Sequence, residues 1–151
     1  HERSRKDAEL GAQSLGLSFN SVSASSAGEL NGAVGAAAKG GAQALFILTD
    51  ALFNSHMPQL AQSAIKNKLP AFYDRNDFVE AGGLISYGVN LPELSRRAAE
   101  YVDKIFKGAK PGDLTLVQPM KFDLAINLKT ANLIGVTIPN EVVQRAVKII
   151  K

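Results

Sequence analysis

The sequence predicts an α/β protein with a doubly wound parallel sheet, and three observations lead to this prediction. Short apolar runs typical of buried strands, such as 44–48 and 70–73, alternate with segments of helical periodicity. A single helical segment, 55–67, separates these two runs, which is the connection that joins neighbouring parallel strands. The 151 residues, 46% of them hydrophobic, are enough to bury one core. We therefore expect 44–48 and 70–73 to be adjacent and parallel.

The N-terminal third begins with a charged segment, 4–15, whose apolar spacing predicts an amphipathic helix. Apolar and polar residues then alternate over 17–22, as in a half-buried strand. Ser26 and Glu29 have the spacing of a capping box, in which each side chain bonds a backbone amide of the first helical turn. They predict a helix that runs to about Lys39. Doubly wound sheets normally begin with a strand, and none precedes 4–15, so we expect the sequence to be a piece of a longer protein.

The rest of the chain continues the alternation. Asp74 and Asn90 stand where helix caps are expected, at the starts of a short and a long helix. The predicted elements are a helix at 74–80, a strand at 84–87, a helix at 91–107, extended pieces at 114–118 and 122–126, and helices at 128–134 and 140–150.

Composition excludes several classes of function. The formal net charge is +3, but the basic residues are dispersed, so we expect no nucleic-acid partner. No apolar run approaches the length of about 20 residues that a membrane span needs. The chain has no cysteine, which excludes disulfides and thiol chemistry.

Motifs for catalysis or cofactor binding are also missing from the sequence. His1 and His56 are the only histidines, too few for a histidine metal cluster. Ser86 lies in "ISYG" rather than in a nucleophile elbow, and the glycine-rich "GAVGAAAKGG" lacks the ending of a phosphate loop. We therefore expect no enzyme, no cofactor and no metal. A flavodoxin-like or nucleotide-dependent enzyme is the disfavoured alternative.

Aromatic, carboxylate and amide side chains follow three successive predicted strands. Ligands bind beyond the carboxyl ends of strands in open parallel sheets, and this mixture of groups suits a small-molecule pocket. The alternative explanation for Asp74 and Asn90 is that they cap helices and do not contact a ligand. Asp50 is harder to explain in this way, because Asn54 or Ser55 can cap the next helix. The predicted ligand-binding residues are Asp50, Phe53, Asn54, Tyr73 and Tyr87.

Three stretches of the chain resemble a known family. They are "TDALFNSHMPQLAQSAIKNKLPAFYD", "FVEAGGLISYGVNLPELSRRAAEYVDKIFKGAKPGDLTLVQP" and "FDLAINLKTANLIGVTIP". In this order they resemble the ABC-transporter substrate-binding proteins of the tryptophan/tyrosine type, which are type I periplasmic binding proteins with two α/β lobes around a cleft. The pieces "KGAKPGDL", "INLKTA" and "GVTIP" are the most specific. The resemblance covers nearly the whole chain.

The resemblance implies a division of the chain. Residues 1–78 belong to the second lobe, 79–116 hold the crossover and a helix and strand of the first lobe, and 117–151 return to the second lobe. The glycines of "EAGGLISYG" (80–88) then mark a hinge, and Tyr87 faces the cleft. Asp50 matches a family aspartate that meets the polar end of the ligand.

The function that the resemblance implies is solute binding for an ABC importer. The ligand is an amino acid or an aromatic or organic acid, and the partner is an ABC permease. The location is periplasmic, or extracytoplasmic with a membrane anchor. A ligand-sensing domain of a regulator or receptor is the alternative. The apolar stripe of 91–107 needs a cover, so we also expect a homodimer through 79–116.

Overall fold

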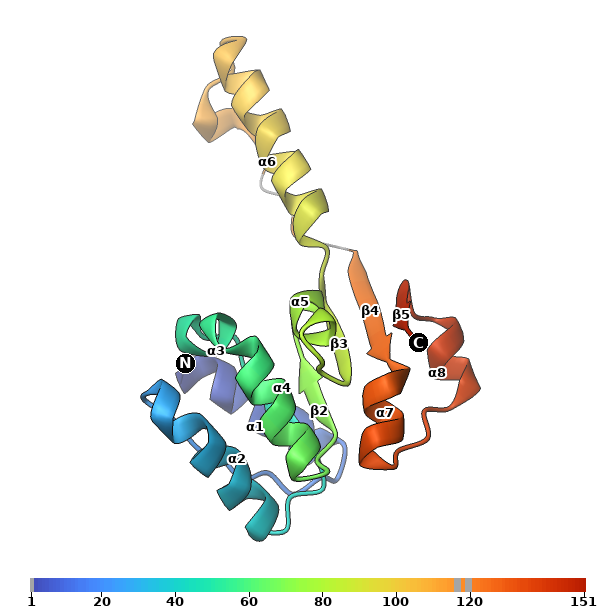
Figure 1. The fold of residues 1–151 in the computed structure, drawn as a ribbon. Coiled ribbons are helices and arrows are strands. Elements are labelled where there is room, and N and C mark those ends of the chain that lie inside the picture. The colour runs from blue at the N-terminus through green and yellow to red at the C-terminus, as the bar shows by residue number, and fades with distance from the viewer. Residues whose placement is uncertain (1, 116–117, 119–120) are drawn as a thin grey trace.

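The structure is a computed structural model of the chain, and it describes residues 2–115, 118 and 121–151. A five-stranded sheet in the order β1-β2-β3-β4-β5 lies at its centre, with helices against it and a long helical arm that leaves the body (Figure 1). The strands are β1 Leu45–Ile47, β2 Ala71–Tyr73, β3 Ile85–Val89, β4 Phe122–Asn127 and β5 Lys148–Ile150.

The sheet confirms the predicted α/β class and differs from an all-parallel sheet at one pairing, between β3 and β4. β1 pairs with β2 in parallel, as expected for 44–48 and 70–73, and β2 pairs with β3 in parallel. β4 runs antiparallel to β3, and β5 runs parallel to β4. The chain leaves β3 into the arm and returns to the same end of the sheet, so β4 has to run back alongside β3 (Figure 1).

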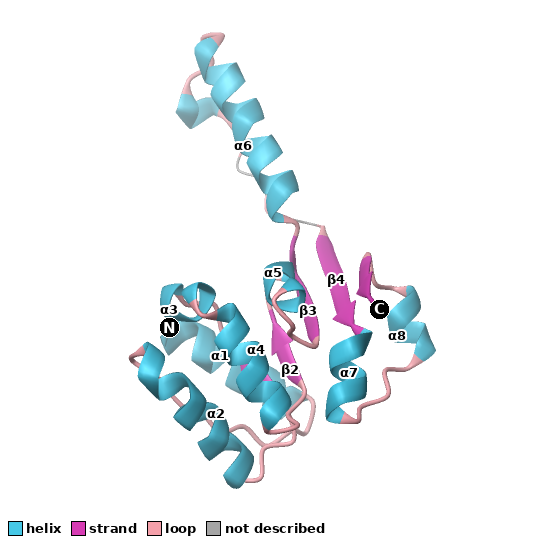
Figure 2. Cartoon of the chain, in the orientation of Figure 1, coloured by secondary structure: helices cyan, strands magenta, loops and turns pink. Residues whose placement is uncertain are grey.

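Helices surround the sheet and connect its strands (Figure 2). Ten of the predicted helix and strand positions agree with the structure to within a few residues. The α-helices are α1 Glu2–Ser14, α2 Leu30–Lys39, α3 Ala51–Ser55, α4 Met57–Lys66, α5 Asn76–Glu80, α6 Leu91–Phe106, α7 Leu128–Ile134 and α8 Asn140–Gln144. Two single 3-10 turns, η1 Ala27–Glu29 and η2 Pro111–Asp113, precede α2 and follow α6.

The core consists of two clusters. The first gathers side chains of α2, α4, β1, β2 and α5, and Tyr73 and Phe78 are its largest fully buried members. The second lies between the β3–β4 pair and α7, with partly buried residues of α8 packed against it. The opposite face of β1 and β2 is less covered, because Phe46 and Phe72 remain 56% and 43% exposed.

Two expectations about local structure are wrong. Residues 17–22 form no strand, and β1 is the edge strand of the sheet. The segment 140–150 is only partly helical, since its last residues form β5 against β4. The predicted helix at 55–67 is confirmed as α4, and a short helix that was not predicted, α3, precedes it with His56 between the two.

The predicted capping box is only half formed. Ser26 precedes η1 without a side-chain cap, whereas the backbone amide of Ser25 donates to Glu29 Oε2 at 2.8 Å. The extended piece 114–118 falls partly on residues outside the description, and Leu114 and Thr115 are not in a strand.

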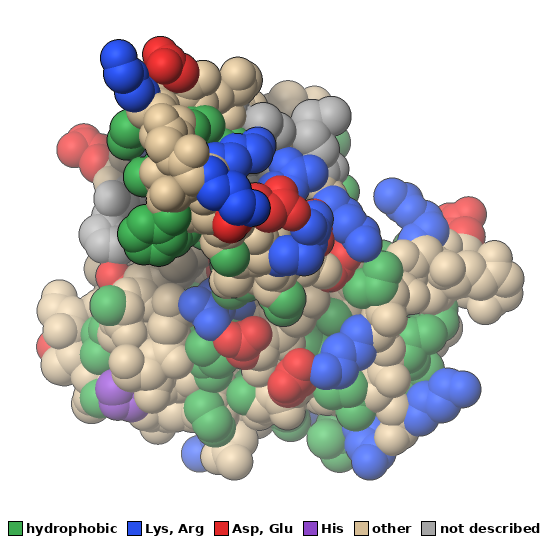
Figure 3. Space-filling view, turned by 90° about the horizontal axis from the view of Figure 1, so that it is seen from above, with side chains coloured by type: hydrophobic (Ala, Val, Ile, Leu, Met, Phe, Trp, Pro, Cys, Tyr) green, Lys and Arg blue, Asp and Glu red, His purple; other side chains and the backbone are tan. Residues whose placement is uncertain are grey.

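The arm consists of α6 and the turn that follows it. α6 has no buried residue, although its apolar side chains recur at three- and four-residue spacing. On its polar side, Glu93 pairs with Arg96 and Arg97, and the view from above shows Lys, Arg, Asp and Glu gathered there (Figure 3). The Tyr101 hydroxyl donates to the Thr115 carbonyl at 2.7 Å, which ties the turn back to the helix. The apolar residues of α6 are Leu91, Leu94, Ala98, Tyr101, Val102, Ile105 and Phe106.

Close packing explains two glycines of the segment 80–88. A Cβ atom on Gly83 would lie 2.7 Å from the Phe78 carbonyl oxygen, and one on Gly88 would lie 1.7 Å from the Asp74 carbonyl oxygen. Gly82 has a φ of 107°, a conformation that other residues rarely adopt. The glycines therefore allow β3 to approach α5 and the end of β2. Whether they also act as a hinge stays a prediction.

Among the described residues, no helix is both long enough and apolar enough to cross a membrane.

Candidate functional site

The carboxyl ends of β1 and β2 lie at the same end of the sheet because the two strands are parallel neighbours. We call this end the β1–β2 edge. α3 follows β1 at this edge and carries Asp50 at its start, with Phe53 and Asn54 in the helix. Tyr73 is the last residue of β2, and Phe53 packs against the core cluster that contains it. The structure thus brings four of the five predicted site residues to one edge of the sheet.

Asp50 caps α3. Its Oδ1 accepts a hydrogen bond from the Leu52 amide at 2.6 Å, and its backbone is extended, as at most N-caps. The expectation that Asn54 or Ser55 would begin the next helix is wrong, because the helix starts directly after Asp50. Its position alone therefore no longer singles out Asp50 as a ligand contact.

Four buried polar atoms at this edge have no hydrogen-bond partner among the described residues. They are Asn54 Oδ1, Tyr73 OH, Asp74 Oδ1 and Arg75 Nε. Leaving such an atom unpaired costs about 1–3 kcal/mol, and buried polar groups in folded proteins are nearly always satisfied. Two of these atoms accept hydrogen bonds and two can donate them.

Tyr73 is held rigidly. It is 1% exposed, and its ring stacks on Phe78 with 4.5 Å between centroids and 16° between planes. Burial raises the pKa of the Tyr73 hydroxyl well above its usual value, so the group stays protonated and can donate a hydrogen bond.

Asp74 does not cap the helix that follows it, contrary to the expectation. α5 begins at Asn76 with Arg75 in the cap position, and no side chain caps it. Burial is the main reason why the pKa of Asp74 is raised, and the neighbouring Arg75 partly offsets it. The Asp74 backbone also lies against Gly88, which limits where its carboxylate can point.

Arg75 forms an ion pair from its Nη2 to Asp77 Oδ2. Its Nε is buried and has no hydrogen-bond partner among the described residues. Sequence reasoning missed Arg75 entirely. The sequence signal that could have pointed to Arg75 is its position between the end of β2 and the start of α5, next to Asp74.

Asn90 does cap its helix, as the alternative interpretation held. Its Oδ1 accepts from the Glu93 amide at 2.8 Å, and its Nδ2 donates to Asp123 Oδ2 at 2.6 Å. These bonds fix the start of α6 to β4.

Tyr87 lies apart from the other predicted site residues. Tyr73 is in register with Ser86, so the next residue along β3 points to the opposite face of the sheet. There Tyr87 stacks on Phe122 with 5.5 Å between ring centroids. Its place in the predicted ligand site stays untested.

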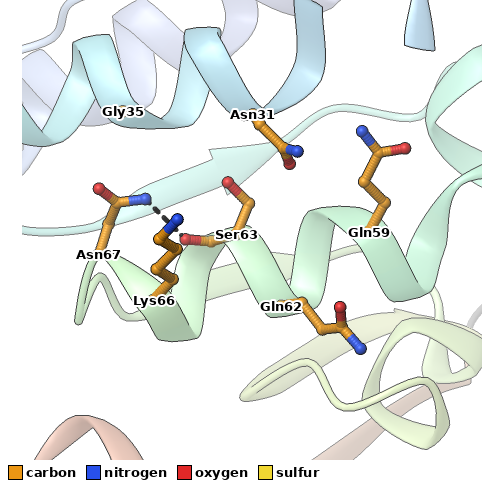
Figure 4. Close-up of a pocket in the computed structure, with 7 residues that line it drawn as sticks. All are labelled: Asn31, Gly35, Gln59, Gln62, Ser63, Lys66 and Asn67. Carbon is orange, nitrogen blue, oxygen red and sulfur yellow. Dashed lines mark hydrogen bonds between the residues drawn. The ribbon is translucent and has the colours of Figure 1, made fainter. Parts of the chain in front are cut away.

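A further cavity of about 300 Å³ lies between α2 and α4 (Figure 4). Two of its amide side chains bond to the protein itself: Gln59 Nε2 donates to the Ala27 carbonyl and Asn67 Nδ2 to the Ser63 carbonyl. The first bond joins α4 to η1 and the second lies within the C-terminal end of α4, and we assign the cavity no chemistry. Its lining residues are Asn31, Gly35, Gln59, Gln62, Ser63, Lys66 and Asn67.

The described residues hold no group of three or more His, Cys, Asp or Glu side chains that could bind a metal. In α/β sheets of this kind, small-molecule ligands bind beyond the carboxyl ends of the strands, where these polar side chains lie. Comparison with known sequences then gives the family. The chain belongs to the ABC transporter substrate-binding proteins, whose family model matches residues 3–150.

Several relatives agree with this assignment. Over 86 residues, 57% of this chain and 25% of the relative, the chain is 28% identical to a "Tyrosine-binding protein" of Clostridioides difficile (strain R20291). A conserved domain protein from Vibrio cholerae matches with a TM-score of 0.81 and 27% identity over 93% of this chain and 47% of its own. A Streptococcus ABC domain solved in complex with L-Trp matches with a TM-score of 0.85 and 25% identity over 99% and 51%. The chain thus spans about half the length of these solved structures, and the resemblance seen in the sequence is confirmed.

Proposed function

We propose that this chain is part of a solute-binding protein that delivers a small organic molecule, an amino acid or an aromatic or organic acid, to an ABC permease. The observation that supports this best is the set of four unpartnered buried atoms at the ends of β1 and β2. A ligand with an anionic and a cationic or hydroxyl end can satisfy the donors of Tyr73 and Arg75 and the acceptors of Asn54 and Asp74 together. Such a protein binds and releases its ligand unchanged, so we propose no enzymatic activity.

The second part of the proposal concerns the two lobes of the protein. One lobe is the body around the sheet, which holds 1–78, 117–151 and also β3, although the sequence division assigned β3 to the other lobe. The arm belongs to the other lobe. The solved relatives are about twice as long as this chain, which supports a two-lobed protein. In that protein, closing a cleft over the β1–β2 edge buries the ligand. The family also supports an extracytoplasmic location, periplasmic or membrane-anchored.

The arm supports the same division. α6 exposes apolar side chains on one side, including Phe106 at 85% and Val102 at 49%, which a lobe of a longer protein would cover. For this chain by itself, we propose that a second copy covers the stripe and forms a homodimer through 79–116.

Ligand titration tests the site. In a two-lobed protein that contains these residues, Tyr73→Phe removes one hydroxyl donor and should weaken L-tyrosine or L-tryptophan binding about 10-fold, the effect of one hydrogen bond of about 1.5 kcal/mol. Tyr101→Phe makes the same change on the arm and is the matched control. Isothermal titration calorimetry measures both. Unchanged affinity in Tyr73→Phe would remove the β1–β2 edge from the site.

The same titration on the 151-residue chain tests the two-lobe proposal. Losing half of the contacts of a micromolar ligand removes about 4 kcal/mol and moves affinity toward the millimolar range. Equal affinity in the chain and in the two-lobed protein would place the whole pocket within these residues and refute the cleft.

A further inference from the structure

A second cavity lies on the other face of the sheet from Tyr73, at the base of the arm. It has a volume of about 410 Å³. One wall comes from β3 and β4 and the other from α8 and its C-terminal end. We call it the β3–β4 cavity, and it is lined by Tyr87, Phe122, Leu124, Val142 and Arg145.

The strand wall of the cavity is a flat aromatic surface. Leu124 is in register with Tyr87, and Phe122 with Val89, so all these side chains point to one face of the antiparallel pair. The Tyr87 and Phe122 rings are nearly parallel, 23° apart, and remain 58% and 47% exposed. Two aromatic rings with so much open surface are unusual on a strand pair that is otherwise well covered, and they offer a stacking surface.

The opposite wall carries a single charge. Arg145 follows α8 as its C-cap residue, and no carboxylate pairs with its guanidinium among the described residues. The other four lining residues are apolar or aromatic, and none is acidic. The cavity thus offers one cation and no anion. A guanidinium binds a carboxylate with two parallel hydrogen bonds, and it does so more strongly beside apolar groups than in water.

We propose that the β3–β4 cavity binds an aromatic carboxylate that lacks an ammonium group. The ring lies against Tyr87 and Phe122, and the carboxylate meets Arg145. A zwitterionic amino acid fits worse, because its ammonium group would be desolvated without an acidic partner. The volume lies within the range of small-molecule sites. This site is separate from the β1–β2 edge and does not depend on the function proposed there.

A pair of probes that differ by one group tests the proposal. 3-(4-Hydroxyphenyl)propanoate is L-tyrosine without its α-ammonium group, and both can be titrated into the 151-residue chain while two-dimensional NMR spectra are recorded. We expect the propanoate to shift the amide signals of β3, β4 and α8. Arg145→Gln should weaken its binding about 10- to 100-fold, the effect of losing a charge-assisted hydrogen bond pair.

Matched variants locate the binding. Arg97→Gln removes a guanidinium from the arm and should not change the affinity for the propanoate. If Arg145→Gln fails to fold, Tyr87→Leu tests the aromatic wall in its place and should weaken binding at least several-fold. The proposal is overturned if the propanoate does not bind, if L-tyrosine binds here equally well, or if Arg97→Gln weakens binding as much as Arg145→Gln.

Discussion

Gly88→Ala should destabilise the protein, because the new methyl group has no room. An ideal Cβ at Gly88 lies 1.7 Å from the carbonyl oxygen, 2.6 Å from the carbonyl carbon and 3.3 Å from the Cα of Asp74. All three are backbone atoms, so neither a rotamer change nor a flexible side chain can relieve the contact. Overpacking in cores costs about 1–3 kcal/mol, and we expect the upper end of this range.

For a chain of this size, about 3 kcal/mol corresponds to a decrease in Tm of about 6–12 °C. Urea unfolding followed by circular dichroism measures the free energy directly. Gly35→Ala is the matched control: its Cβ would meet nothing within 4 Å, and alanine favours the helix that contains it. It should therefore raise stability by about 0.5–1 kcal/mol. If Gly88→Ala unfolds within 0.5 kcal/mol of the parent, a variation typical of surface sites, the close approach of β3 to Asp74 is wrong.

Two further predictions concern Asp74 and Asn90. The pKa of Asp74 is raised in the folded state, so the folded protein holds a proton more strongly than the unfolded chain, and stability falls as pH rises from below 3.8 through the folded pKa. Asp74→Asn removes this loss, so the variant should be more stable than the parent at pH 7. Urea titrations should show that this difference in stability vanishes below pH 3.8. A difference in stability that is independent of pH would contradict the burial of this carboxylate. Asn90→Ala removes the cap of α6 and should cost the arm about 1 kcal/mol. Hydrogen exchange should then speed up in the first turn of α6 and stay unchanged in α4. Equal exchange of the first turn of α6 in Asn90→Ala and in the parent would show that the cap is dispensable.

The sequence was informative where an element could be read from its own residues. Apolar runs and a single crossover helix were enough to place β1 beside β2 in parallel, and periodicity was enough for α6 and α7. The sequence-based prediction failed where pairing with another strand decides whether a segment forms a strand. Residues 17–22 have the alternation of a strand but do not join the sheet, and 148–150 look helical in sequence but pair with β4.

The candidate site shows the same limit. Asp50 and Asp74 both follow strands, and sequence spacing suggested that the second was the cap and the first was available to a ligand. The structure assigns the cap to Asp50 and leaves a buried oxygen of Asp74 without a partner. For Asp74 a shift of one residue in the cap position decides this, and for Asp50 the cause is α3, a short helix that was not predicted. Helix boundaries are the least certain part of a sequence-based prediction. The face to which Tyr87 points depends in the same way on strand register.

The arm gives the protein a long reach from a narrow base. α6 has 16 residues, which makes it about 24 Å long, and it joins the body through β3 on one side and the return to β4 on the other (Figure 1). A tilt of about 10° at that base would carry its far end through about 4 Å. Small changes in the twist of the β3–β4 pair are therefore magnified at the tip, and a spectroscopic label near Phe106 would report on events at the sheet that are too small to see there.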